Sequence, residues 1–169
     1  MVRTRILGID PGSRLTGYGI VESDGHRSVH ILSGCVRAGS GPLPERLGVI
    51  YGELEAIVAE YEPGELAVEA VFVARNASAA LKLGHARGAA ICAGVCHGLP
   101  VSEYSARLVK QALVGSGSAD KVQVRHMVSR LLSFDEDLQE DAADALAVAL
   151  CHAHTRATLA RCRIARLHR

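Results

Sequence analysis

Four acidic residues interrupt three segments that otherwise have the composition of a protein core. Asp10 closes the apolar segment RILGID, Glu69 lies within LAVEAVF, and Asp141 and Asp144 lie three residues apart in EDAADALAVAL. A carboxylate that leaves water is destabilising unless a cation or hydrogen-bond donors compensate its charge. Because carboxylate oxygens are the ligands that Mg²⁺ and Mn²⁺ prefer, the pattern predicts a divalent metal site.

A site of this kind can cut phosphodiesters. Two metal ions about 4 Å apart can activate a water molecule and stabilise the leaving 3′ oxygen during in-line attack on phosphorus. Lys110 and Lys121 lie in a basic part of the chain, where either could neutralise the charge that develops on the scissile phosphate. Surface lysines are usually only solvated, however, and Glu140 and Asp141 would fit the acidic first turn of a helix equally well.

Basic residues are unevenly distributed along the chain. The formal net charge is +1, yet residues 74–126 contain seven Lys and Arg residues against two acids, and residues 155–169 contain five Arg residues and no acid. Basic surfaces around an acidic, metal-loaded centre would suit a polyanion, and solvated helix faces are the plain alternative. Phe72 could stack on an unpaired base or pack in the core. The residues that we expect to contact DNA are Phe72, Arg75, Asn76, Lys82, Arg107, Lys110 and Lys121.

Residue periodicity predicts an α/β fold in which a mixed five-stranded sheet is flanked by helices. Strand patterns, the first three joined by short turns as an antiparallel meander, cover residues 3–10, 15–25, 26–39, 66–72 and 100–105. Helical patterns, with apolar residues three or four apart, cover residues 43–62, 76–96, 106–114, 120–133 and 140–154. Because strands alternate with helices after the meander, the later strands should be parallel.

Length and cysteine content limit the class of protein. A chain of 169 residues fits one domain, which we expect over residues 1–155, followed by a basic tail over residues 156–169 that need not be ordered. No apolar run approaches the ~20 residues of a membrane span, and five cysteines at irregular spacing with no export signal indicate reduced thiols in a cytoplasmic protein. Cys92 and Cys96 share a helix face and could bind a metal, although small buried cysteines are common core residues.

Several of these segments together resemble the RuvC-type Holliday junction resolvases. The matching segments are ILGIDPGSRLTGYGI, LAVEAVF with RNASAALKLGHARG, EYSARLVKQALVGSGSADKVQV and DAADALAVA, in the order of the family and over most of the chain. The resemblance implies a ribonuclease H-like fold and a DNA-contacting aromatic at Phe72. It also implies catalytic metal-binding acids at Asp10, Glu69, Asp141 and Asp144, and functional lysines at Lys110 and Lys121. Some family members carry histidine where Asp141 stands, so this ligand is the least fixed of the four.

The same resemblance implies a substrate and partners. Members of the family act as homodimers that nick two strands of like polarity across a four-way DNA junction, in recombination and repair, leaving 5′-phosphate and 3′-hydroxyl ends. They also work with a branch-migration complex. We therefore expect a Mg²⁺-dependent crossover junction endodeoxyribonuclease with two ions in each site, for which Mn²⁺ substitutes. A two-fold protein suits a junction with approximate two-fold symmetry, and the small-residue helix SAALKLGHARGAAICAGV is the candidate dimer interface.

Three other functions would use the same residues. An actin-like ATPase also places an aspartate and glycines around phosphate in its first hairpin, but that fold needs two such domains and this chain supplies one. A non-catalytic module that binds junctions would have no need of four intact carboxylates. A ribonuclease H that acts on RNA–DNA hybrids would share the carboxylate chemistry, and only a comparison of substrates would distinguish it.

Overall fold

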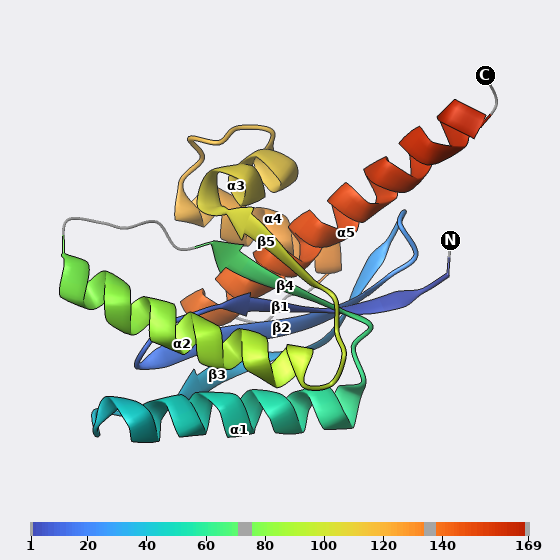
Figure 1. Ribbon diagram of the computed structural model, residues 1–169. Coiled ribbons are helices and arrows are strands. Elements are labelled where there is room, and N and C mark those ends of the chain that lie inside the picture. Colours follow the sequence, from blue (N-terminus) through green and yellow to red (C-terminus); the bar gives the residue numbers. More distant parts are fainter. Residues whose placement is uncertain (1, 71–75, 134–137, 168–169) are drawn as a thin grey trace.

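The structure is a computed structural model, and it describes residues 2–70, 76–133 and 138–167, with side chains described as far as Cys162. Phe72 and Arg75, two of the residues expected to contact DNA, lie outside these ranges. Within them, one five-stranded sheet is covered by helices on both faces (Figure 1). No helix among these residues is long and apolar enough to cross a membrane.

The sheet is mixed, as the sequence predicts, with the strand order β3-β2-β1-β4-β5. The first three strands form the antiparallel meander, and β4 and β5 then add to β1 in parallel. The parallel pairing brings the carboxyl ends of β1 and β4 to the same edge of the sheet, which is where two of the four acids lie. The strands are β1 (Thr4–Asp10), β2 (Leu15–Ser23), β3 (Ser28–Arg37), β4 (Glu65–Ala70) and β5 (Val101–Ser105).

The helices divide between the two faces of the sheet (Figure 1). Side chains on one face form a hydrophobic core with α1 and α2, and those on the other form a second core with α3, α4 and α5. Two layers of helices therefore bury both faces, as parallel strands require. The helices are α1 (Leu43–Tyr61), α2 (Ala77–Val95), α3 (Ala106–Val114), α4 (Lys121–Leu132) and α5 (Glu140–Leu167).

Glycines on β1 and β2 allow α5 to lie directly on the sheet. A Cβ atom at Gly8 would stand 2.2 Å from the carbonyl oxygen of Ala145, and one at Gly17 would stand 2.0 Å from the carbonyl oxygen of Asp141. Any larger residue at either position would push the helix away. Because Gly17 pairs with Asp10, this close approach places the first turn of α5 beside the end of β1.

Helix α5 is longer than the sequence analysis predicts. The expected helix ends at residue 154, but α5 continues to Leu167, and its C-terminal part projects beyond the body of the molecule (Figure 1). Residues 155–167 contain neither Pro nor Gly, so nothing in them ends a helix. Their arginines also suit the negative end of the helix dipole. The basic residues assigned to a tail are, as far as Leu167, a continuation of α5.

Candidate active site

Two of the four predicted acids meet at one edge of the sheet. Asp10 is the last residue of β1, and Glu69 is the last but one of β4. The two strands are parallel neighbours in which Ile9 pairs with Val68, so these residues end up side by side. Their carboxyl groups are joined by a hydrogen bond. The parallel register therefore brings together two residues that lie 59 positions apart in the chain.

Helix α5 contributes the third acid to the same cavity. Asp144 lines a cavity of about 260 Å³ together with Asp10 and Glu69. Lys110 of α3 and Lys121 of α4 also line it, among apolar side chains such as Val109 and Val148. Asp141 is not among the lining residues, because its turn of α5 packs on Gly17, but its negative charge still acts on Asp10. Three of the four acids and both predicted lysines thus share one cavity.

The acids repel one another strongly. Burial, the hydrogen bond with Glu69, and the charges of Glu69, Asp144 and Asp141 raise the pKa of Asp10 to about 8. Burial also raises the pKa of Glu69, and the charge of Asp144 adds to this effect. The hydrogen bond with Asp10 and the charges of Lys121 and Lys110 act in the opposite direction. Asp10 and Glu69 therefore behave as a coupled pair that retains a proton at neutral pH.

Lys121 reaches into the acidic cluster from the first residue of α4. Asp120 caps this helix through a capping box with Gln123, which fixes the backbone from which Lys121 extends. Its Nζ atom lies 3.1 Å from Oδ2 of Asp144 and 2.6 Å from Oε1 of Glu140. These hydrogen bonds raise the pKa of Lys121, so its ammonium group remains charged beside the acids.

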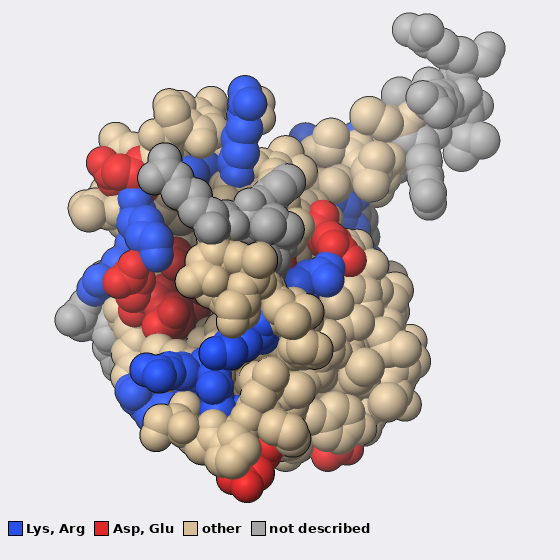
Figure 2. Space-filling view, turned by 60° about the vertical axis from the view of Figure 1, so that its left-hand side comes forward, with Lys and Arg blue, Asp and Glu red and all other residues tan. Residues whose placement is uncertain are grey.

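The predicted DNA-contacting residues that the structure describes lie on α2 and at its N-cap, on α3 and, for Lys121, on α4. Lys82 and Arg107 are exposed on these helices. Asn76 is the N-cap of α2, where its side-chain oxygen accepts a hydrogen bond from the backbone N–H of Ala79 at 3.1 Å. This residue therefore has a structural role in addition to the predicted contact with DNA. Figure 2 shows Lys and Arg side chains on both sides of a cluster of acids on this face of the molecule. The arrangement matches the predicted basic surface around an acidic centre.

One residue that supports the site, an arginine of α1, was not predicted from the sequence. Arg46 of α1 is only 8% exposed. Its Nε atom donates a hydrogen bond to the carbonyl oxygen of Ser13 at 2.7 Å, and Nη2 donates to the same oxygen. This contact anchors the turn that follows Asp10. A signal was present in the sequence, because Arg46 precedes Ile50, Leu54 and Val58 at intervals of four residues on the buried face of the helix.

The donor set suits a hard divalent cation such as Mg²⁺ or Mn²⁺, because the described residues that line the cavity offer carboxylate oxygens and no thiol or imidazole. Among the described residues, no three His, Cys, Asp or Glu side chains already stand at the spacing of a metal site. Cys92 and Cys96 are both exposed on α2, so the expectation that they are buried core residues is wrong.

Three comparisons with known proteins agree on the family to which this chain is similar. The family model of the crossover junction endodeoxyribonuclease RuvC matches residues 6–152. Crossover junction endodeoxyribonucleases RuvC from Methylococcus capsulatus and Alkalilimnicola ehrlichii are 60% and 59% identical to this chain, over 94% and 89% of it and 95% and 91% of their own lengths.

Solved structures extend the likeness to the fold. RuvC of T. thermophilus in complex with a Holliday junction substrate superimposes with a TM-score of 0.87 at 35% identity, over 92% of this chain and 96% of that one. The yeast mitochondrial Holliday junction resolvase Ydc2 shares the fold with a TM-score of 0.70 at 10% identity, over 94% of this chain and 82% of that one. The predicted ribonuclease H-like architecture is thereby confirmed. By the match of its sequence and its structure, the chain belongs to the RuvC family of crossover junction endodeoxyribonucleases.

Proposed function

We propose that the protein is a metal-dependent endonuclease that resolves four-way DNA junctions. Paired nicks would leave 5′-phosphate and 3′-hydroxyl ends, in the cytoplasm, during recombination and repair. The observation that supports this most is the gathering of Asp10, Glu69 and Asp144 with two lysines in one cavity, in a chain of the RuvC family. A phosphodiester is itself an anion, so these acids would repel it unless cations lay between them.

Asp10, Glu69 and Asp144, with Asp141 from the neighbouring turn, are the residues that would hold the cations. Mg²⁺, for which Mn²⁺ would substitute, with two ions in each site, would polarise the scissile phosphate and lower the pKa of the attacking water. The protein itself would contribute charged side chains that already stand in place around the cavity. Lys110 and Lys121 would face the phosphate from α3 and α4, and their ammonium groups would neutralise negative charge on its oxygens.

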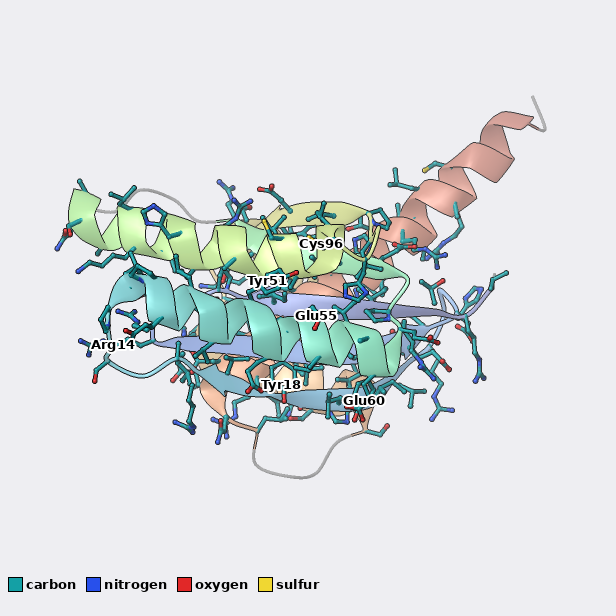
Figure 3. The ribbon with its side chains drawn as sticks, turned by 60° about the horizontal axis from the view of Figure 1, so that its bottom comes forward. Arg14, Tyr18, Tyr51, Glu55, Glu60 and Cys96 are labelled. Atoms are coloured by element: carbon teal, nitrogen blue, oxygen red, sulfur yellow. The ribbon has the colours of Figure 1, made fainter. Side chains whose placement is uncertain are left out.

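A homodimer with its interface on the helical face of α1 and α2 completes the proposal. The two helices lie side by side (Figure 3). Leu81 is exposed on α2, and in the described residues a Cβ atom at Gly84 or Gly88 would meet no atom within 4 Å. An open face of small and apolar residues allows a second copy to approach closely. Two subunits would present two active sites to the two strands that must be nicked, and a branch-migration complex would deliver the junction.

Cleavage of a labelled synthetic four-way junction tests the proposal. With Mg²⁺ we expect paired, ligatable nicks in the junction and little cutting of a linear duplex or an RNA–DNA hybrid of the same sequence. The matched control is Asp10→Asn, which keeps the volume of the side chain and removes one charge. Preferential cutting of the hybrid would instead identify a ribonuclease H, and full activity in excess chelator would contradict the metal-dependent chemistry.

A further inference from the structure

Glu140 contacts the same ammonium group as Asp144, although it does not line the cavity. Nζ of Lys121 lies 2.6 Å from Oε1 of Glu140 and 3.1 Å from Oδ2 of Asp144. Glu140 and Asp144 lie four residues apart on α5, so they are neighbours on one face of the helix. Lys121 is therefore shared between a carboxylate inside the cavity and one outside it.

This contact does little for the stability of the fold. The side chains of Lys121 and Glu140 are 64% and 63% exposed, whereas that of Asp144 is 26% exposed. An ion pair between solvated side chains is a weak contributor to folding, because water screens the charges and two long side chains lose freedom. The fold therefore depends little on the ion pair between Glu140 and Lys121, and the main effect of Glu140 should be on the position of the Lys121 side chain.

The charges around Lys121 indicate what that effect is. An ammonium group has three donors, and two of them are directed at Asp144 and Glu140. Asp144 is one of the acids proposed to hold a cation, and a cation there would repel the ammonium group and occupy the carboxylate. Glu140 is then the acid that still holds Lys121 near the cavity. Arg125, whose charge also acts on Glu140, lies one turn further along α4.

We propose that Glu140 is a positioning residue that holds Lys121 at the mouth of the active site while the ammonium group directs a further donor at a phosphate of bound DNA. The inference rests on the proposed function, because it takes DNA as the substrate. It requires Glu140 to have two opposite effects. Its carboxylate competes with the phosphate for Lys121 and so weakens binding, and it restricts the conformations of Lys121 and so speeds cleavage once DNA is bound.

Glu140→Gln separates these effects. We expect the variant to bind the junction more tightly than the unsubstituted protein, measured in Ca²⁺ to prevent cutting. The slope of the logarithm of the binding constant against the logarithm of the salt concentration should be steeper by up to about 0.9, because the freed lysine contacts one more phosphate. We expect single-turnover cleavage at saturating protein to slow by about 2- to 10-fold, because an unrestrained lysine must be immobilised during the reaction. The melting temperature should fall by no more than a few degrees, because Glu140 is also an acid of the first turn of α5. A purely structural role would lower it while leaving binding affinity and cleavage rate unchanged.

Two controls make the test decisive. Glu60→Gln removes the same charge from an exposed position near the end of α1 (Figure 3), and we expect neither the binding affinity nor the cleavage rate to follow the Glu140 pattern. In a Lys121→Met background, Glu140→Gln should no longer tighten binding, since the two residues act as one unit. The binding arm remains measurable even if Lys121→Met cuts no DNA.

Equal effects of Glu140→Gln with and without Lys121 would overturn the inference. So would a variant in which binding and cleavage weaken together. Failure of the unsubstituted protein to cut any junction would instead contradict the proposed function, so the two failures can be told apart.

Discussion

Strand β4 carries a glutamate near each end, and the two have opposite surroundings. Glu65 at its start forms an ion pair with Arg156, whose Nε atom lies 2.8 Å from Oε1, and a hydrogen bond with Nε2 of His152 at 2.5 Å. Nδ1 of His152 is in turn 2.7 Å from the hydroxyl of Tyr104. Glu69, four residues later on the same face of the strand, has two acids, Asp10 and Asp144, as neighbours, and the charges of Lys121 and Lys110 offset only part of the rise in its pKa.

Both environments are set by α5, which packs across the sheet (Figure 1) and carries both Asp144 and His152. These residues lie eight positions apart on the helix, and so on the same face. At one end α5 supplies positive or neutral partners to a glutamate, and at the other it supplies a further acid. The protein thus neutralises one half-buried glutamate and compensates the other only in part, which leaves it able to bind a cation from solution. Residue type alone does not mark a metal ligand; incomplete compensation of its charge does.

Removal of a cavity carboxylate should have the largest effect on activity. We expect Glu69→Gln, Asp10→Asn or Asp144→Asn to abolish junction cutting while junction binding survives, because each removes a charge but almost no volume, and DNA affinity rests on basic groups elsewhere. Single-turnover cleavage and a gel-shift assay in Ca²⁺ measure the two properties. Loss of binding and cutting in equal measure would point to a role in folding instead.

Substitution of the other glutamate should have the reverse effect. Glu65→Gln leaves Arg156 and His152 without their acid, and Glu65 is only 22% exposed, so we expect a loss of about 3 kcal/mol in the free energy of unfolding. For a domain of this size the melting temperature would fall by about 6 to 12 °C. Cleavage measured well below that temperature should stay within a few fold of normal. A Glu65→Gln protein of full stability and no activity would remove the distinction between the two ends of β4.

The pH dependence of stability sharpens the comparison at the cavity end. In the metal-free fold the pKa of Asp10 is raised from its ordinary 3.8 to about 8, so the folded state favours the protonated acid. The contribution of Asp10 is therefore full below about pH 4 and is lost as the pH rises towards 8. As the pH rises from about 4 to 8, the free energy of unfolding of Asp10→Asn should therefore increase relative to that of the unsubstituted protein. The increase should be at most about 1.4 kcal/mol per pH unit. Urea unfolding in chelator measures the difference, and a difference independent of pH would contradict the coupled acid pair.

Phe72 gives the smallest predicted effect and lies outside the described residues. If it stacks on a base, Phe72→Ala should leave the melting temperature almost unchanged and weaken productive engagement of the junction by roughly 1 to 3 kcal/mol. A core phenylalanine would instead cost about 3 to 5 kcal/mol of stability. Thermal unfolding and single-turnover cleavage of this one variant distinguish the two roles.

Local patterns in the sequence predicted the strands, most of the helices and the gathering of the acids. Asp10 and Glu69 were recognisable because each is a charged residue within or at the end of an apolar strand, but the parallel pairing of their two strands follows only from the structure. The partners of Glu65 were not recognisable, since His152 follows it by 87 positions, and a glutamate at the start of a strand has no unusual pattern. The contact from Arg46 to Ser13 spans 33 positions and was missed for the same reason. Interactions between distant segments decide which buried charges are compensated.

Thermal unfolding with and without divalent cations tests most directly the claim that the charge of Glu69 is only partly compensated and that a metal ion completes the compensation. Mg²⁺ or Mn²⁺, in the absence of DNA, should raise the melting temperature of the unsubstituted protein and of Glu65→Gln, because a ligand that binds only the folded state stabilises it by about 2.7 kcal/mol at a concentration of 100 Kd. Glu69→Gln should show little or no such rise. An equal rise in Glu69→Gln and in the unsubstituted protein would show that the cation binds elsewhere and would contradict the account.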